Sequence, residues 1–254
     1  MKHRPRKRFG QNFLQDEVYQ QRIASSIQVK TGDKLIEIGP GQGAITAHLL
    51  RSHGSLTAIE MDRDLTASLQ AKFGDEGLDV IEGDALKVDF VALAGEGKLS
   101  VIGNLPYNIS TPLIFHLLAS LKHINQMVFM LQKEVVDRMV APPGDKTYGR
   151  LSIMAGLHLD AERLFNVPPG AFFPQPKVTS SVVRLTPNGR EIDAHTQQRL
   201  AQIVGSAFGQ RRKTLRNAIK GLVSEEQILS VGLDPKKRPE NLSVEDFLSL
   251  ASCV

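Results

Sequence analysis

Cysteine and long apolar runs are the two features that this sequence has least of. Cys253 is the single cysteine among 254 residues, which excludes an intrachain disulfide and any metal cluster built from several cysteines. No apolar stretch is long enough to cross a bilayer, and the basic N-terminal segment lacks the apolar core of a signal peptide. We therefore expect a cytoplasmic protein with no membrane partner.

The composition that is present is that of an ordinary globular protein. Hydrophobic residues make up 41% of the chain and charged residues 23%, so neither disorder nor a fibre is indicated. A chain of this length can bury a sizeable core, and we expect one α/β domain with a smaller appendage.

Positive charge is concentrated in three segments, although the net charge is only +4. Such clusters on an otherwise balanced chain are typical of surfaces that contact phosphates. The alternative is a solvated tail and a solvated helix face. The three clusters are Lys2, Arg4, Arg6, Lys7 and Arg8; Arg211, Arg212, Lys213, Arg216 and Lys220; and Lys236, Lys237 and Arg238.

Strand and helix signals alternate over residues 1–188, which is typical of a mostly parallel sheet covered on both faces. The expected strands are Lys34 to Ile38, Ser55 to Glu60, Leu78 to Glu82, Leu99 to Asn104, Met127 to Leu131, Ser152 to His158 and Val178 to Leu185. The expected helices are Ala44 to Arg51, Leu65 to Phe73, Pro112 to Leu121, Thr196 to Phe208, Arg211 to Leu222, Glu225 to Val231 and Val244 to Leu250. We therefore expect an α/β domain over residues 1–188 and a helical domain over residues 189–254.

A glycine-rich turn, Gly39 to Gly43, joins the first expected strand to the helix that follows it. Glycine allows the backbone to approach a ligand without interference from a Cβ atom. The spacing is G-x-G-x-G rather than the G-x-G-x-x-G of dinucleotide-binding proteins. In addition, Pro40 has no backbone N–H to donate to a phosphate. Both features favour a smaller, less anionic cofactor and disfavour an NAD-dependent dehydrogenase.

Two acidic residues stand after the next two expected strands. Glu60 lies about 20 residues beyond the glycine turn, where a carboxylate can accept both hydroxyls of a ribose. Asp84 follows the third strand and can accept a hydrogen bond from an adenine amino group. Taken singly, each acid could be a helix cap or a surface residue. As an ordered set with the glycine turn, they predict S-adenosylmethionine, whose sulfonium tolerates nearby carboxylates.

The segment Asn104-Leu105-Pro106-Tyr107 follows the fourth expected strand, where open α/β sheets place their ligands. The amide oxygen of Asn104 and the carbonyl of Leu105 or Pro106 can accept both N–H groups of an adenine N6 amine, which localises its lone pair. Tyr107 can stack on the base, and much of the rate then comes from positioning and electrostatic preorganisation, without a strong base. The alternative is a simple loop in which Pro106 makes the turn and Tyr107 fills a groove.

A proline-rich loop, Val167 to Val178, offers a second aromatic side chain for the same base. We expect Phe172 to be presented there as an exposed ring on a stiff backbone, and Phe173 to be a core side chain. An adenine in folded RNA would have to leave its stack to enter such a site.

The motifs together resemble the KsgA (RsmA) family of rRNA adenine N6,N6-dimethyltransferases over nearly the whole chain. The resemblance is carried by Phe9 to Leu14, Glu37 to Gly43, Glu60 to Asp62, Gly83 to Leu86, Asn104 to Thr111, Tyr148 to Ser152, the Phe172 loop and Phe208 to Asn217. It implies a Rossmann-like class I S-adenosylmethionine-dependent methyltransferase domain, here with a basic N-terminal arm, and a small all-α C-terminal domain.

The resemblance also implies a substrate and a set of site residues. The substrate would be two adjacent adenosines in the 3′-terminal hairpin of 16S rRNA, on the small ribosomal subunit or its precursor, with a role in subunit biogenesis. Separately, we expect a monomer. Cofactor contacts would come from Asn12, Leu14, Gly39, Glu60, Asp84 and Asn104, and RNA contacts from Arg211, Arg212, Lys213 and Arg216. Phe173 and Gln175 depart from the family's usual small residue and proline.

Two further alternatives remain open from the sequence. One is the related enzyme that methylates an adenine of 23S rRNA and confers macrolide resistance, although the segment Arg211 to Asn217 and the Phe172 loop favour the small-subunit enzyme. The other is a non-catalytic ribosome assembly factor, against which the intact Asn104 to Tyr107 segment argues.

Overall fold

The computed structural model describes residues 11–107, 109–210 and 212–253. The chain forms two compact units, of which the first comprises residues 1–136 and 162–187 and the second residues 137–161 and 188–254. The N-terminal basic cluster and Arg211 lie outside the described residues.

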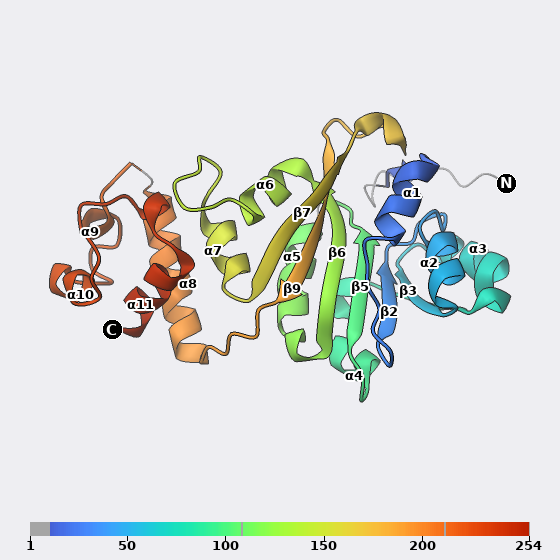
Figure 1. Ribbon diagram of the computed structural model, residues 1–254, viewed down its shortest axis with the longest axis horizontal. Coiled ribbons are helices and arrows are strands. Elements are labelled where there is room, and N and C mark those ends of the chain that lie inside the picture. Colours follow the sequence, from blue (N-terminus) through green and yellow to red (C-terminus); the bar gives the residue numbers. More distant parts are fainter. Residues whose placement is uncertain (1–10, 108, 211, 254) are drawn as a thin grey trace. The chain divides into compact units, whose positions relative to one another are not determined.

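A seven-stranded sheet organises the first unit, with the strand order β4-β3-β2-β5-β6-β9-β7 (Figure 1). Neighbouring strands from β4 to β6 are parallel, whereas β9 is antiparallel to β6. The sheet is therefore mostly parallel, as predicted, with β9 running antiparallel to β6. The strands are β2 (Lys34–Ile38), β3 (Leu56–Glu60), β4 (Leu78–Glu82), β5 (Leu99–Asn104), β6 (Ile124–Gln132), β7 (Leu159–Val167) and β9 (Ser180–Pro187).

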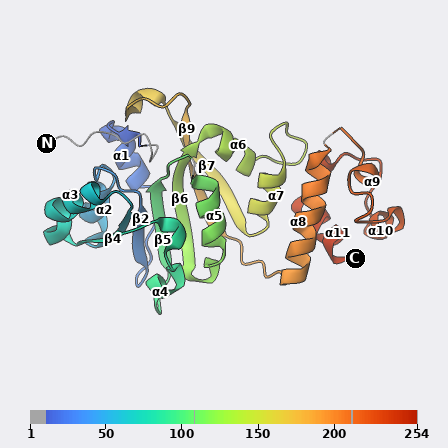
Figure 2. The ribbon, with the colours of Figure 1, turned by 180° about the vertical axis from the view of Figure 1, so that it is seen from behind.

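Helices connect the parallel strands, and α5 lies in front of the sheet when the molecule is seen from behind (Figure 2). Asp16 and Asp62 begin α1 and α3 by accepting backbone N–H groups of the first turn, as N-cap residues do. The helices are α1 (Glu17–Ala24), α2 (Thr46–His53), α3 (Arg63–Phe73), α4 (Phe90–Ala94), α5 (Ser110–Leu118) and α6 (Lys133–Met139). The sequence patterns predicted α2, α3 and α5 but missed α1, α4 and α6.

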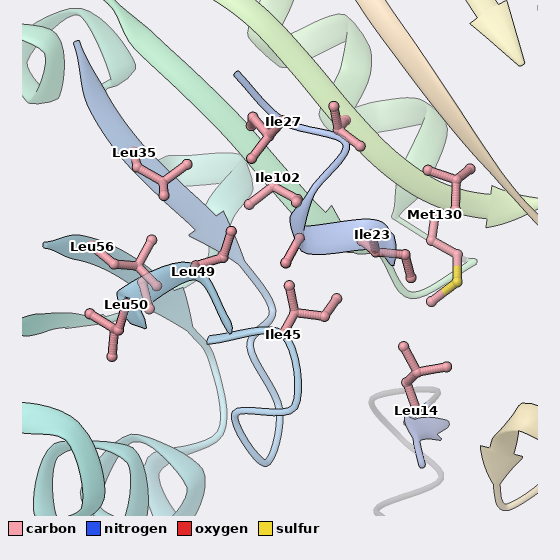
Figure 3. Close-up of a cluster of buried hydrophobic side chains, with 14 of the residues drawn as sticks. Leu14, Ile23, Ile27, Leu35, Ile45, Leu49, Leu50, Leu56, Ile102 and Met130 are labelled. Carbon is pink, nitrogen blue, oxygen red and sulfur yellow. The ribbon is translucent and has the colours of Figure 1, made fainter. Parts of the chain in front are cut away.

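The core of the first unit extends from the sheet to the segment that precedes α1. Leu14 and Ile23 are buried in one cluster with Leu35, Ile102 and Met130 of the strands (Figure 3). A two-residue strand β1 (Phe13–Leu14) pairs antiparallel with β8 (Phe172–Phe173). The residues just before α1 are thereby fixed beside the Phe172 loop, over 150 residues away in the chain.

The second unit is helical and contains its own apolar core. Ile153 and Leu157 of the first segment are buried in a cluster with Leu200, Ile203 and Phe247 of the second. This shared core explains why residues 137–161 group with residues 188–254, whereas the sequence analysis placed them before the division at residue 188. The helices are α7 (Arg150–Gly156), α8 (Ala194–Gly209), α9 (Leu215–Ala218), α10 (Glu225–Ser230) and α11 (Val244–Ser252).

Two predicted elements are wrong. Residues 152–158, expected as a strand, lie mostly in α7, and the strand β7 begins only at Leu159. A short apolar run fits a buried helix as well as a strand, and Met154 and Ala155 have high helix propensity. The helix expected over residues 211–222 is reduced to α9, which covers four residues.

No helix among the described residues is long and apolar enough to cross a membrane.

Candidate active site

A cavity of about 320 Å³ opens at the carboxyl ends of the parallel strands in the first unit. Because β4, β3, β2 and β5 are adjacent and parallel, the residues at their ends stand in the order Asp84, Glu60, Gly39 and Asn104 along one edge of the sheet. All four line the cavity, together with Gln11, Asn12, Phe13, Leu14, Glu37, Met61, Leu105, Pro106, Tyr107 and Phe172. The fold thus brings the predicted cofactor residues and the predicted base-binding residues into one cavity.

The glycine turn owes its composition to its backbone conformation. Gly39, Gly41 and Gly43 have φ values of +68°, +59° and +80°, in the left-handed region that other residues rarely adopt. A Cβ atom on Gly41 would lie 3.2 Å from the ring of Phe13. The G-x-G-x-G spacing therefore matches three backbone positions with left-handed φ. At one of them, Gly41, the ring of Phe13 also leaves little room for a side chain.

Glu60 is held in place by the backbone on both sides of it. Its two carboxylate oxygens accept the N–H of Asp62 at 2.8 Å and that of Gly41 at 3.2 Å. Burial raises the pKa of Glu60, and these hydrogen bonds oppose the rise. Each oxygen keeps a second lone pair, so the carboxylate can still accept the two hydroxyls of a ribose.

Asp84 and the segment before α1 also line the cavity. One carboxylate oxygen of Asp84 accepts the N–H of Leu86 at 3.0 Å and caps a short 3₁₀ turn, which leaves the other oxygen for a ligand. Asn12 and Leu14 line the same cavity. The resemblance alone pointed to these two residues, and the β1–β8 pairing explains their position.

The side-chain amide of Asn104 has a defined orientation. Its Nδ2 donates to the backbone oxygen of Asn12 at 3.3 Å, so Oδ1 is the atom left to accept a hydrogen bond from a ligand. The carbonyl of Pro106 already accepts the N–H of Ile109 at 3.1 Å. Of the two backbone acceptors considered from the sequence, Leu105 is therefore the more available.

Tyr107 is tied to the far end of the Phe172 loop. Its hydroxyl lies 3.0 Å from the hydroxyl oxygen of Ser180, the first residue of β9. This hydrogen bond links the Asn104–Tyr107 segment to the neighbouring antiparallel strand and limits the ring's motion.

The two phenylalanines of the loop have exposures opposite to those expected. Phe172 is 5% exposed, packs in the core cluster beside Leu14 and lines the cavity. Phe173, expected in the core, is 64% exposed. The reason is strand alternation, because two successive residues of β8 must point to opposite sides and Phe172 takes the inner one.

Glu37 is a cavity residue that the sequence analysis did not include in the site. It is 1% exposed, and one of its carboxylate oxygens accepts the Thr46 hydroxyl at 2.6 Å. Burial raises the pKa of Glu37 to about 7; the Thr46 hydrogen bond opposes the rise and the Glu60 carboxylate adds to it. Its signal was its place near the end of β2, two residues before Gly39.

The charge of the cavity discriminates between cofactors. Glu37, Glu60 and Asp84 line it, and no lysine, arginine or histidine does so among the described residues. Such a lining repels a pyrophosphate and suits a ligand that carries a sulfonium and an ammonium group. The residues present therefore fit S-adenosylmethionine, and the described part of the chain contains no cluster of side chains suited to a metal ion.

The predicted RNA-contacting side chains belong to the second unit. Arg212, Lys213 and Arg216 are all exposed, and Arg216 also forms an ion pair with Glu225 at 3.2 Å. Leu215 donates its N–H to the carbonyl of Lys237 at 2.7 Å, which brings the second and third basic clusters side by side.

Comparisons with known proteins find relatives along nearly the whole chain. A family model described as ribosomal RNA adenine dimethylase matches residues 2–254. A curated relative from Pseudomonas aeruginosa, named ribosomal RNA small subunit methyltransferase A, is 53% identical, with 98% of this chain and 94% of the relative covered. A relative of the same name from Methylococcus capsulatus is 52% identical, with 99% of this chain and 98% of the relative covered.

Solved structures match the fold over nearly the whole chain. A dimethyladenosine transferase from Plasmodium falciparum has a TM-score of 0.77 and 28% identity, covering 94% of this chain and 95% of its own. The 23S rRNA methyltransferase ErmE has a TM-score of 0.76 at 22% identity, covering 95% and 99%, and supports the fold alone.

These findings confirm the predicted Rossmann-like methyltransferase fold, the predicted enzyme class and S-adenosylmethionine as the cofactor. The chain belongs to the ribosomal RNA adenine dimethylase family.

Proposed function

We propose that this enzyme dimethylates the N6 amino groups of two adjacent adenosines in the 3′-terminal hairpin of 16S rRNA, on the small ribosomal subunit or its precursor. The observation that carries the proposal is the Asn104 amide, which lines an acidic cavity and whose nitrogen donates to Asn12, so that its oxygen is left to accept from a ligand. The names of the relatives at 52–53% identity support the small subunit over the large one. We expect a cytoplasmic monomer.

In this proposal the cofactor residues are Asn12, Leu14, Gly39, Glu60, Asp84 and Asn104. Asp84 would accept from the adenine amine, Glu60 would accept from the ribose hydroxyls, and the glycine turn would allow the backbone to approach the amino-acid portion. When bound, S-adenosylmethionine supplies an activated methyl group on a cationic sulfur. Because Asp84, Glu60, Gly39 and Asn104 follow neighbouring strands in that order, we expect the methyl-donating end to lie toward Asn104.

The residues after β5 would then prepare the target amine. Asn104 Oδ1 and the Leu105 carbonyl accept its two N–H groups, which localises the nitrogen lone pair out of the ring system. Tyr107 and Phe172 hold the base between them, and Pro106 fixes the backbone that aligns the two acceptors. No described side chain is needed as a strong base, because the methylated nitrogen becomes acidic and loses its proton to solvent.

A direct test is transfer of labelled methyl groups to small ribosomal subunits that lack these modifications, followed by mapping of the labelled nucleotides. We expect label on two adjacent adenosines of the 3′-terminal hairpin. Label confined to the large subunit would instead establish the macrolide-resistance type of activity. No transfer to either subunit would favour a non-catalytic assembly factor.

The base-binding role of Asn104 is tested with the Asn104→Ala variant in the same assay. We expect kcat to fall at least about 100-fold, as for loss of a preorganised hydrogen-bond partner in the transition state, while cofactor affinity changes much less. Asn104→Ala with full activity would contradict the acceptor role. Ser55→Ala serves as a control and should leave kcat unchanged, because Ser55 is exposed and directly precedes β3, at the end of that strand away from the cavity.

A further inference from the structure

The exposed ring of Phe173 has no place in the site described so far. It is 64% exposed although it directly follows Phe172, which lines the cavity. Burial of a phenylalanine side chain stabilises a fold by about 1.5–3 kcal/mol. The exposed ring of Phe173 does not contribute this stabilisation, which is consistent with a role in binding.

The backbone that presents Phe173 is held firmly. Phe173 is paired with Phe13 in the β1–β8 sheet, and the preceding Ala171 accepts the N–H of Gln15 at 2.8 Å. The ring is therefore presented on fixed backbone, and little conformational entropy is lost when a ligand stacks on it.

The loop that carries Phe173 contains a cation and no acid. Residues 167–178 include Lys177 but no aspartate or glutamate. Lys177, four positions beyond Phe173, is exposed, as is Gln175. Aromatic rings interleaved with cations and amides are typical of surfaces on which unpaired bases stack.

We propose that Phe173 stacks on the nucleotide next to the target adenosine, outside the cavity, while the target itself lies between Tyr107 and Phe172. This inference rests on the proposed function. An adenosine that leaves its stack deprives its neighbour of a stacking partner, and a ring one residue beyond the cavity wall can replace that partner. Because the two substrates are adjacent, the nucleotide held by Phe173 would be the other adenosine of the pair.

The test compares methyl-transfer kinetics of Phe173 variants on unmethylated small subunits. Stacking on an aromatic side chain is worth about 1–3 kcal/mol per base, so Phe173→Ala should raise KM for the subunit about 5- to 150-fold. The kcat at saturation and the affinity for S-adenosylmethionine should stay at wild-type values. Phe173→Trp should preserve the KM, whereas Phe173→Leu, apolar but not planar, should resemble Phe173→Ala.

Val178→Ala provides the matched control, because Val178 is an exposed apolar residue of the same loop at 42% exposure. Its KM should equal that of the wild type. Phe173→Leu that matches wild type would show a general apolar contact and overturn the stacking proposal. A Phe173→Ala variant with unchanged KM but altered sedimentation would assign the ring to protein association and would equally overturn it.

A second measurement locates the contact on the RNA. Small subunits are assembled with 2-aminopurine either at the target position or at its neighbour, and its fluorescence is quenched by stacking. Phe173→Ala should raise the emission of the neighbour only, and a rise at the target only would overturn the assignment. Wild-type enzyme that methylates no small subunit would instead refute the proposed function itself.

Discussion

Glu60 shows how a single carboxylate can serve the fold and the ligand together. It binds the backbone of Gly41 in the glycine turn and of Asp62 at the N-cap of α3. Glu60→Ala removes both contacts and the expected ribose contact. We expect cofactor binding to weaken by about 1–3 kcal/mol, the usual cost of leaving such partners unsatisfied.

Isothermal titration with S-adenosylmethionine measures this loss directly. Glu60→Gln keeps one oxygen acceptor and should give an affinity between those of the wild type and Glu60→Ala. An unchanged dissociation constant in Glu60→Ala would remove this residue from the cofactor site.

Glu37 carries a prediction about pH. The pKa of Glu37 is about 7 in the folded protein against an ordinary value of 4.5, because burial disfavours the charged form. Between these two values the folded state binds more protons than the unfolded state, so stability falls as pH rises from about 4.5 to 7 and then levels off. A difference of this size corresponds to about 3 kcal/mol.

The Glu37→Gln variant should lack this contribution, since the amide does not ionise. Urea unfolding from pH 5 to pH 8 should show the wild type losing stability relative to the variant by up to about 3 kcal/mol as pH rises. A constant difference between the two proteins across this range would contradict the raised pKa.

At the scale of the element, two glycines with similar φ values distinguish the cost of a left-handed backbone from the cost of a steric clash. Gly43 has φ +80°, and a Cβ atom there would lie 2.5 Å from the ring of Phe73 in α3. Gly54, which ends α2, has the similar φ of +75° but nothing within 4 Å of a Cβ atom. Gly54→Ala should therefore cost only the left-handed conformation, about 1–2 kcal/mol.

Gly43→Ala should cost that amount and a further 1–3 kcal/mol or so for the clash with Phe73. Urea denaturation of the two variants gives the difference directly. Equal losses of stability would mean that α3 shifts freely to accommodate the methyl group.

The parallel strands could be predicted closely because each is a short segment rich in aliphatic residues and bounded by turn residues. β2, β4 and β5 begin and end at the predicted residues. The segment of α7 was misassigned because its apolar residues pack in the helical core, and a run of that length has no period that distinguishes helix from strand. Its helical structure depends on packing against α8 and α11, whose residues lie outside the local sequence.

The site was predictable to the extent that its residues follow strands in chain order. Glu60, Asp84 and Asn104 are positioned by parallel strands, so their meeting could be inferred from topology alone. Asn12 reaches the cavity through pairing of β1 with β8, an interaction between residues over 150 positions apart that no local pattern signals. The exposures of Phe172 and Phe173 depend on the same pairing, and the local pattern led to the opposite expectation.

At the scale of the whole molecule, the basic clusters predict salt-dependent binding. Arg212 and Lys213 are exposed, and Lys237 is held near them by the backbone hydrogen bond to Leu215. Reversing Arg212 and Lys213 to glutamate should weaken RNA binding. It should also flatten the plot of log affinity against log salt by about 0.7–0.9 for each phosphate that the variant no longer neutralises.

Lys30 and Lys98 provide the control, since both are exposed and lie before β2 and β5, at the end of the sheet opposite the cavity. Their reversal changes net charge equally and should affect the slope much less. Binding to small subunits between about 50 and 200 mM salt measures both slopes. Equal slopes for the two double variants would show a general charge effect instead of a defined interaction.

The helical unit is built from two stretches of chain separated by β7, β8 and β9, and this has a consequence for truncation. Truncation at residue 188 would remove α8 and α11, against which α7 packs. Ile153 and Leu157 would then be exposed to water. A fragment that ends there would expose an apolar surface and would tend to aggregate. Loss of methylation by such a fragment could therefore result from misfolding as well as from missing RNA contacts. The role of residues 188–254 is better tested by point substitutions in the full-length chain.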